Sequence, residues 1–190
     1  VLIQHSSLVN LATSISKIYT LNPADKLLQL ATINFDISVE DIFSTLISGA
    51  NLVIADKLWI TNSENFWNLC ELNKITVLDL PTAFWHNLLL STPSIPDCIR
   101  HLSVGGEKIK QEALNDWFSK VSATTTLCNM YGPTECTVDS TFAFLSNGDG
   151  HLGRPLPNYQ IYILDAHGNQ MPVGVWGELH IGGVGLARGY

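Results

Sequence analysis

Apolar and polar residues follow two patterns along the chain, one typical of helices and one typical of strands. Apolar residues spaced three and four apart predict helices over 8–17, 39–47, 63–72, 81–90 and 108–121. Short, mostly apolar runs predict strands over 27–33, 51–55, 75–79, 99–104 and 124–129. The first five residues, Val-Leu-Ile-Gln-His, also have the composition of a strand. Because strands and helices alternate, the pattern predicts an α/β fold with a parallel sheet covered by helices.

The helix predicted over 39–47 has clear boundary signals. Ser38 is the expected N-cap, and Glu40 and Asp41 follow in the first turn, where the helix dipole favours carboxylates. Gly49 ends the helix. Its apolar residues recur at i, i+3, i+4, i+7 and i+8, so we expect an amphipathic helix.

Three predicted strands end at a constant interval. Asp79, Val104 and Asn129 lie 25 residues apart, which is room for one strand and one helix in each repeat. Such βαβ units form parallel sheets, and ligands bind beyond the carboxyl ends of their strands. We therefore expect Asp79, the loop of Gly105, Gly106 and Glu107, and the loop after Asn129 to share one crevice.

The character of the chain changes after about residue 147. Glycine, proline and β-branched residues become frequent, and strands are predicted over 159–164 and 175–181 with a turn over 165–169. We expect residues 1–146 to form the α/β region and residues 147–190 to begin a β-rich subdomain. The chain starts without methionine and stops abruptly after Gly-Tyr, so we expect an internal piece of a longer protein, with both regions incomplete.

Composition excludes several classes of function. The chain is 46% hydrophobic and 14% charged, with a net charge of −7 and no basic run, so nucleic acid is not an expected partner. No apolar run approaches the roughly 20 residues of a membrane span. The four cysteines show neither CxxC pairs nor zinc-like spacing to histidine, which favours reduced thiols in a cytoplasmic protein.

The most informative string runs from Asn129 to Glu135, Asn-Met-Tyr-Gly-Pro-Thr-Glu. Gly132 and Pro133 favour a turn directly after a strand. Thr134 and Glu135 then offer a hydroxyl and a carboxylate, which suit a phosphate and its Mg²⁺. Taken alone, the string also fits an ordinary turn with a solvated acid.

Together with three further strings, this motif resembles the adenylation domains of non-ribosomal peptide synthetases, within the adenylate-forming AMP-dependent synthetase/ligase family. The others are Asn34–Ser38 (Asn-Phe-Asp-Ile-Ser), residues 177–190 (Gly-Glu-Leu-His-Ile-Gly-Gly-Val-Gly-Leu-Ala-Arg-Gly-Tyr), and the first five residues, which resemble those after the family's phosphate loop. The resemblance covers the whole chain in the family's order. It implies the large N-terminal domain of that fold.

The resemblance also implies an activity. The carboxylate of an amino acid attacks the α-phosphorus of ATP, giving aminoacyl-AMP and pyrophosphate, and the phosphopantetheine thiol of a carrier protein then takes the acyl group. Thr134 and Glu135 match the catalytic pair, with Glu135 as the Mg²⁺ ligand. The residues that match the nucleotide site are Gly105, Gly106, Glu107, Asn129, Tyr131 and Gly132. Carrier-protein and condensation domains of the same synthetase are the implied partners.

The amino-acid pocket of this family falls on Asp36, Ile37, Glu40, Asp79, Ser103, Gly105, Met130, Val138 and Asp139. Asp36 matches the acid that pairs with the substrate ammonium, although it could also be a capping acid. Three further acids suggest a cationic side chain, arginine first, then lysine or ornithine. Two of these acids also have ordinary structural explanations. Glu40 could interact with the helix dipole, and Asp139 could be exposed to solvent.

Three parts of the family's machinery fall outside the sequence. The phosphate loop would precede Val1, and both the acid for the ribose hydroxyls and the subdomain with the catalytic lysine would follow Tyr190. We therefore expect residues 1–190 alone to be inactive. The alternatives are an acyl-CoA synthetase or luciferase-like ligase, a non-catalytic adenylation-like interaction module, and a plain nucleotide-binding α/β protein.

Overall fold

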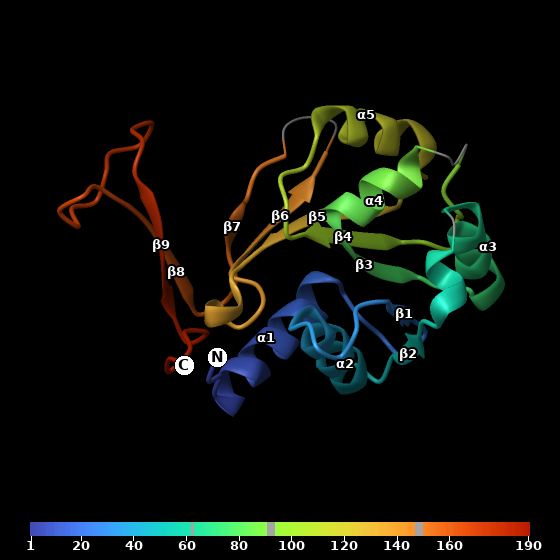
Figure 1. The fold of residues 1–190 in the computed structure, drawn as a ribbon, viewed down its shortest axis with the longest axis horizontal. Helices are drawn as coiled ribbons and strands as arrows, with labels where there is room; N and C mark the ends of the chain where they lie inside the picture. Colours follow the sequence, from blue (N-terminus) through green and yellow to red (C-terminus); the bar gives the residue numbers. More distant parts are fainter. Residues whose placement is uncertain (62, 91–93, 147–149) are drawn as a thin grey trace.

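In the part of the chain described by the computed structural model, residues 1–61, 63–90, 94–146 and 150–190, seven strands form one sheet. The sheet order is β2-β1-β3-β4-β5-β6-β7, and its first five strands are parallel (Figure 1). The strand bounds are β1 Lys26–Gln29, β2 Asn51–Ile54, β3 Val77–Pro81, β4 His101–Gly105, β5 Thr126–Tyr131, β6 Thr141–Leu145 and β7 Arg154–Pro155. The predicted α/β fold with a parallel sheet is confirmed.

Helices cover the two faces of this sheet, because consecutive side chains of each strand point to opposite faces. On one face lie α1 (His5–Ile18) and α2 (Ile37–Ile47). On the other lie α3 (Ser63–Asn73), α4 (Thr82–Leu89) and α5 (Gln111–Lys120), packed around the buried Trp85 and Trp117. Two short 3₁₀ turns complete the helical elements, η1 Lys57–Ile60 and η2 Thr134–Cys136.

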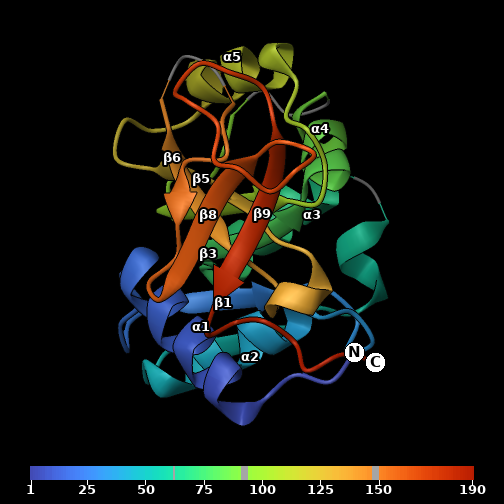
Figure 2. The same ribbon diagram turned by 90° about the vertical axis from the view of Figure 1, so that its left-hand side faces the viewer.

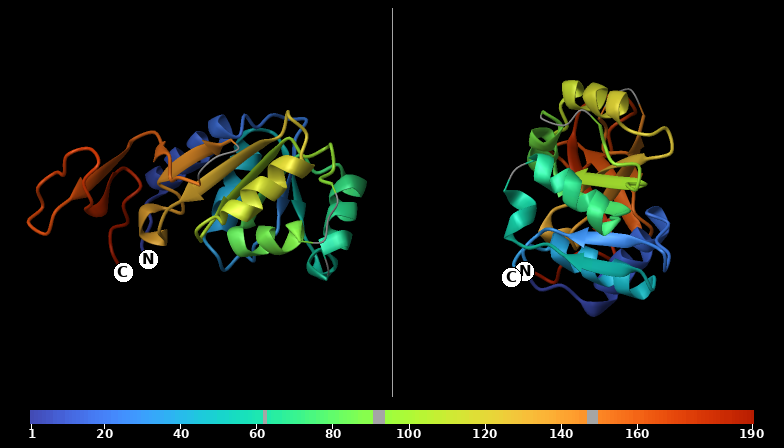
Figure 3. Two further views of the ribbon diagram at one scale, coloured as in Figure 1. Left: turned by 90° about the horizontal axis from the view of Figure 1, so that it is seen from above. Right: turned by 90° about the vertical axis from the view of Figure 1, so that its right-hand side faces the viewer.

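A separate two-stranded ribbon projects from the end of the sheet that carries β7. Strands β8 (Tyr159–Leu164) and β9 (Glu178–Gly183) pair in antiparallel fashion, and Figure 3 shows them extending away from the main body. Because β7 still pairs with β6, the large sheet continues to Pro155, beyond the boundary expected at residue 147. The two ends of the chain lie side by side (Figure 2), where the Leu2 amide donates to the Gly189 carbonyl at 2.7 Å.

Several local predictions were wrong in their details. Residues 1–4 form no strand of the sheet, and α1 begins at His5. Ser38 is not the N-cap, because it lies inside α2 and its hydroxyl donates to the Phe35 carbonyl at 2.7 Å. The strand expected over 27–33 ends at Gln29, and the helix expected from residue 108 begins at Gln111.

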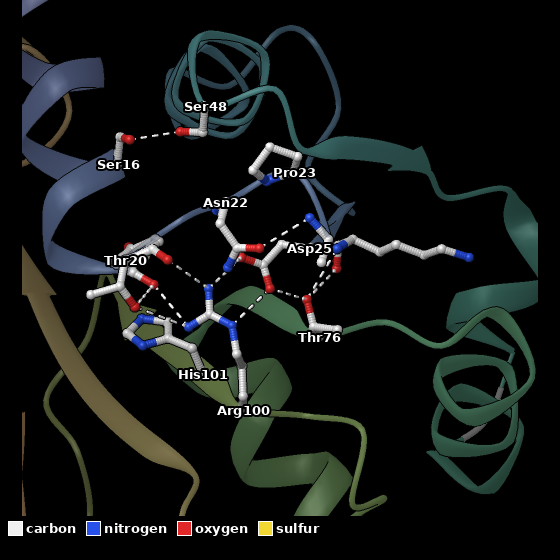
Figure 4. Close-up of polar contacts among 12 residues, drawn as sticks. Ser16, Thr20, Asn22, Pro23, Asp25, Ser48, Thr76, Arg100 and His101 are labelled. Carbon is white, nitrogen blue, oxygen red and sulfur yellow. Dashed lines mark hydrogen bonds and ion pairs between the residues drawn. The ribbon is translucent and has the colours of Figure 1, made fainter.

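An ion pair between the buried Asp25 and the partly exposed Arg100 joins the amino ends of three strands (Figure 4). Arg100 donates to both carboxylate oxygens of Asp25, at 2.7 Å from Nε and 2.6 Å from Nη2. Asp25 also accepts from the Thr76 hydroxyl at 2.8 Å, and Arg100 Nη1 donates to the Tyr19 carbonyl at 2.9 Å. Because these residues precede β1, β3 and β4 and follow α1, the network fixes the last turn of α1 against the sheet.

The described residues contain neither a membrane-spanning helix nor a disulfide bond. No helix there has the length and apolar character needed to cross a membrane. All four cysteines are free thiols, as expected.

Candidate functional site

The site lies at the carboxyl ends of β3, β4 and β5, which are neighbours in the sheet. Asp79 is in register with Ser103, and Ser103 with Cys128. The glycine loop after β4 and the Gly-Pro-Thr-Glu loop after β5 therefore leave the sheet at one edge (Figure 1). The three strand ends lie at one edge of the sheet, as expected, but Asp79 is not among the lining residues of the two cavities described below, so the shared crevice stays a prediction.

Helix α2 covers this edge with its polar side inward. Its buried residues are Ser38, Glu40, Asp41, Ser44 and Thr45. Its apolar residues face outward instead, and Leu46 is 58% exposed. The helix is amphipathic, as the sequence indicates, but its polar face meets the sheet. The matching surface below it is also polar, because Asp79 and Ser103 point to this face of their strands.

Four carboxyl groups are buried within this polar layer. Asp41 of α2 is 1% exposed and its Oδ1 has no hydrogen-bond partner, and the other three come from three different elements. Glu40 of α2, Asp79 of β3 and Asp139 before β6 are 0%, 4% and 6% exposed. Glu40 Oε2, Asp139 Oδ2 and both oxygens of Asp79 have no hydrogen-bond partner. The ion pairs among the described residues are Arg100–Asp25, Lys120–Asp116 and His180–Glu178, so no cationic side chain neutralises the three acids.

Burial raises the pKa of each of these acids, since a desolvated carboxylate is unfavourable. The pKa of Asp79 rises to about 6 and that of Asp139 to about 7. Glu40 has a pKa well above its ordinary value, because of burial first and then repulsion from Asp139 and Asp79. Ser103 and Glu40 moderate the rise at Asp79, although neither makes a hydrogen bond of normal geometry to it.

Asp36 lies at the start of α2 and against the Gly-Pro-Thr-Glu loop, close enough to Asp139 to contribute to the raised pKa of that acid. The Asp36 carboxylate accepts a hydrogen bond from the Thr134 hydroxyl. A cavity of about 190 Å³ opens beside the pair and is also lined by Val138. Ile37 follows Asp36 as the first residue of the helix and is half-buried. The structure thus brings together Asp36 and Val138, both predicted for the amino-acid pocket, and Thr134, predicted for the catalytic pair.

A second cavity, of about 490 Å³, lies on the other side of this loop. Its lining is Gly106, Glu107, Lys108, Ile109, Asn129, Met130, Tyr131, Gly132, Asp139, Gly150, His151 and Leu152. Seven of these are residues predicted from the sequence. Asp139 connects this cavity to the acid cluster. The lining residues that were missed, because no motif marks them, are Lys108, Ile109, Gly150, His151 and Leu152. The Asn129 side-chain amide donates to the His151 carbonyl at 2.9 Å.

Two glycines allow the strand ends and loop to pack closely. A Cβ atom on Gly132 would lie 2.4 Å from the Val138 carbonyl oxygen, so no larger residue fits there. A Cβ on Gly105 would lie 3.0 Å from the Met130 carbonyl oxygen. The absence of side chains at these positions lets the backbone itself form the cavity wall.

The loop after β5 is strained and is fixed from outside. Thr137 and Val138 have φ angles of 59° and 65°, which are unfavourable for β-branched residues. The Tyr159 hydroxyl donates to the Cys136 carbonyl at 2.7 Å, and the Thr137 hydroxyl donates to the Gly185 carbonyl at 2.6 Å. Neither Tyr159 nor Thr137 was predicted as a site residue. The only sequence signal was the glycine-rich string that contains Gly185.

Glu135 is exposed at the mouth of the site. Its carboxylate accepts a hydrogen bond from the Tyr190 hydroxyl, which lowers its pKa. Among the described residues, no three His, Cys, Asp or Glu side chains are grouped to hold a metal ion. Mg²⁺ is commonly held by one or two carboxylates together with phosphate oxygens. Glu135 beside Thr134 therefore fits a Mg²⁺ ion that arrives with a phosphate ligand, and does not fit a metal site made by protein alone.

Comparison with known proteins gives consistent matches over the whole chain. The family model described as "AMP-binding enzyme" matches residues 1–190. The dimodular nonribosomal peptide synthase of Bacillus subtilis (strain 168) is 37% identical over 193 residues, covering 100% of this chain and 8% of that protein. Bacitracin synthase 3 of Bacillus licheniformis is 38% identical over 192 residues, covering 100% of this chain and 3% of that protein. The chain thus spans a small part of the length of these relatives.

Solved structures match in the same way. The four-domain nonribosomal peptide synthetase holo-AB3403, bound to AMP and glycine, superposes with a TM-score of 0.90 at 33% identity, covering 99% of this chain and 14% of that one. The N-terminal subdomain of Klebsiella oxytoca NpsA superposes with a TM-score of 0.85 at 24% identity, covering 100% of this chain and 48% of that one, which supports the fold alone.

Proposed function

This chain belongs to the AMP-binding enzyme family, and we propose that the full-length protein uses ATP to activate a cationic amino acid. Arginine is the first candidate, followed by lysine and ornithine. The large sheet and its helices, which continue to Pro155, would supply most of the amino-acid and nucleotide site, and the ribbon of β8 and β9 would begin the β-rich subdomain. The aminoacyl group would pass to the phosphopantetheine of a carrier domain that, like a condensation domain, belongs to the same cytoplasmic synthetase.

The buried acid cluster carries the proposal of a cationic substrate. Glu40, Asp79 and Asp139 place four oxygen atoms without hydrogen-bond partners in one buried layer, and none of the three acids forms an ion pair within the described part of the chain. Burying a polar group without a partner costs free energy, and more so if it is charged. A guanidinium or ammonium group would supply both the hydrogen-bond donors and the missing charge.

The other predicted site residues would bind either the amino acid or ATP. Asp36 would pair with the substrate ammonium, and Ile37, Ser103, Gly105, Met130 and Val138 would complete the amino-acid pocket. The adenine would occupy the cavity beside Gly106, Glu107, Asn129, Tyr131 and Gly132, whose volume of about 490 Å³ is in the range of ligand pockets. Thr134 would contact phosphate, and Glu135 would hold Mg²⁺, which neutralises charge on phosphate oxygens.

The proposed reaction is an in-line displacement at phosphorus. An oxygen of the amino-acid carboxylate forms a bond to the α-phosphorus of ATP, and the bond from that phosphorus to the bridging oxygen breaks, so that pyrophosphate leaves. In the second step a thiolate attacks the carbonyl carbon and AMP leaves. In the first step Asp36 and the acid cluster would hold the amino acid at its two cationic groups, which fixes the direction of its carboxylate.

Amino-acid-dependent exchange of pyrophosphate into ATP by the full-length protein tests this proposal. We expect arginine, lysine or ornithine to support exchange at least tenfold better than citrulline, the neutral analogue of arginine. A preference for leucine or phenylalanine would refute the cationic pocket. Residues 1–190 alone should support no exchange, since the family's phosphate loop and catalytic lysine do not occur in them.

A further inference from the structure

We propose that Tyr19, at the end of α1, is a positioning residue that sets the charge selectivity of the amino-acid pocket through Glu40. The proposal rests on the cationic pocket described above and extends it to a residue that neither the motifs nor the cavity linings include. Tyr19 does not reach the substrate in this arrangement. It acts through the carboxylate of Glu40, which contacts the substrate in this proposal.

The contact between the two residues is direct and buried. The Tyr19 hydroxyl donates to Glu40 Oε1 at 3.0 Å, and both side chains are at most 1% exposed. Glu40 Oε2 has no partner. One oxygen of the carboxylate is therefore fixed by the protein while the other remains available. This division suits a carboxylate that must be held in one orientation and still accept a hydrogen bond from a ligand.

Tyr19 is itself held through both its backbone and its ring. Its carbonyl accepts a hydrogen bond from Arg100 Nη1 at 2.9 Å, and Arg100 is paired with Asp25 through two hydrogen bonds (Figure 4). Its ring packs against that of His101, with centroids 4.2 Å apart. Such support fixes the position of the hydroxyl, since neither the backbone nor the ring can shift without breaking these contacts.

The hydrogen bond has a consequence for charge. A donor bonded to a carboxylate favours its ionised form, whereas burial and the nearby Asp79 and Asp139 oppose ionisation of Glu40. Burial and these acids also raise the pKa of Tyr19 well above its ordinary value, so the hydroxyl keeps its proton and remains a donor. Tyr19 thus makes it easier for Glu40 to be ionised beside a cationic side chain. It offers no comparable advantage when the side chain is neutral.

The variant Tyr19→Phe removes the hydroxyl and keeps the ring. In full-length protein, pyrophosphate exchange with arginine and with citrulline gives kcat/KM for each. Because a hydrogen bond to a charged group contributes about 1.5–3 kcal/mol, we expect the ratio of arginine to citrulline to fall about tenfold or more, mainly through a higher KM for arginine.

A matched control separates this role from simple docking of α1 on α2. Ser16→Ala removes another hydrogen bond between α1 and the end of α2, from Ser16 to Ser48 at 2.6 Å, without touching Glu40. We expect its arginine-to-citrulline ratio to stay within twofold of the wild type. A loss of selectivity in Ser16→Ala equal to that of Tyr19→Phe would assign the effect to packing and overturn the role of Tyr19.

A double variant completes the test. If Tyr19 acts through Glu40, adding Tyr19→Phe to Glu40→Gln should cause no further loss of selectivity. An unchanged ratio in Tyr19→Phe beside a cation-selective wild type would overturn the role of Tyr19 alone. A wild type that prefers neutral amino acids would overturn the proposed substrate and this inference together. Thermal unfolding of each variant checks that the domain is folded.

Discussion

We expect the buried Asp79 carboxylate to lower the free energy of unfolding of the substrate-free protein. Its side chain is 4% exposed, both of its oxygens lack partners, and burial raises its pKa from 3.8 to about 6. A pKa difference of one corresponds to about 1.4 kcal/mol, so the ionised form costs about 3 kcal/mol in the substrate-free protein. Replacing Asp79 with asparagine keeps the shape, removes the charge and places an amide donor beside the carboxyl groups of Glu40 and Asp139.

The sign of the pH dependence follows from the raised pKa. Between about pH 4 and pH 6 the folded protein binds more protons at Asp79 than the unfolded chain, so the stability of the wild type falls as pH rises. Above pH 6, Asp79 is ionised in the folded protein, and the stability of the wild type is lower by the full amount of about 3 kcal/mol. Asp79→Asn should therefore match the wild type near pH 4 and be more stable by about 2–3 kcal/mol at pH 8, while losing affinity for a cationic amino acid.

Thermal unfolding of the full-length protein without substrate, at pH 4.5 and pH 8, measures this difference. The exposed acid Asp97 provides a control, since Asp97→Asn changes the net charge equally without altering the buried layer. We expect Asp79→Asn to raise the unfolding temperature by several degrees at pH 8 and by about one third as much at pH 4.5. An Asp79→Asn protein that is less stable than the wild type at pH 8 would refute the view that Asp79 is an uncompensated charge.

Three further predictions concern the surrounding structure. Asp25→Ala removes the carboxylate partner of the partly exposed Arg100 and should cost about 1.5–3 kcal/mol in the free energy of unfolding at pH 7, measured by denaturant titration. Gly132→Ala forces a Cβ against the Val138 carbonyl and should abolish pyrophosphate exchange while leaving α-helical circular dichroism intact. Burial lowers the pKa of His101 to about 3, so the wild type should lose up to about 1.4 kcal/mol per pH unit below pH 6.5 relative to His101→Asn, the opposite slope to that of the acids.

The strand ends were predictable because the interval of 25 residues depends only on local periodicity and on the topology of βαβ units. Asp79 stood out in the sequence as a carboxylate at the end of an apolar strand, and the structure buries it without a partner. The convergence of the two loops on one sheet edge follows from parallel pairing alone.

Helix α2 shows what periodicity leaves open. The spacing of its residues defines two faces but does not say which one meets the sheet. The usual preference for burying the apolar face is reversed here, and the buried polar side makes its side-chain contacts with α1, from Tyr19 to Glu40 and from Ser16 to Ser48. Its exposed apolar face includes Phe43 and Leu46.

Tyr19 and Tyr159 were missed for a related reason. Each is an aromatic residue that the sequence presents as ordinary core, and each becomes informative only through one hydroxyl contact to a distant segment, at Glu40 and at Cys136. The strand expected at residues 1–5 failed likewise, since Leu2 pairs only with residues 188–189 at the other end of the chain.

The central claim is that buried acids select a cationic amino acid. Calorimetric titration of the full-length protein with arginine at pH 6.5, in two buffers of different ionisation enthalpy, measures the protons exchanged on binding. Since the pKa values of Asp79 and Asp139 are about 6 and about 7, a bound guanidinium should drive their ionisation and release about one proton from these two acids, and more where Glu40, whose pKa burial also raises, ionises with them. Citrulline should release none. Arginine that binds without proton release, or citrulline that binds more tightly than arginine, would contradict the account.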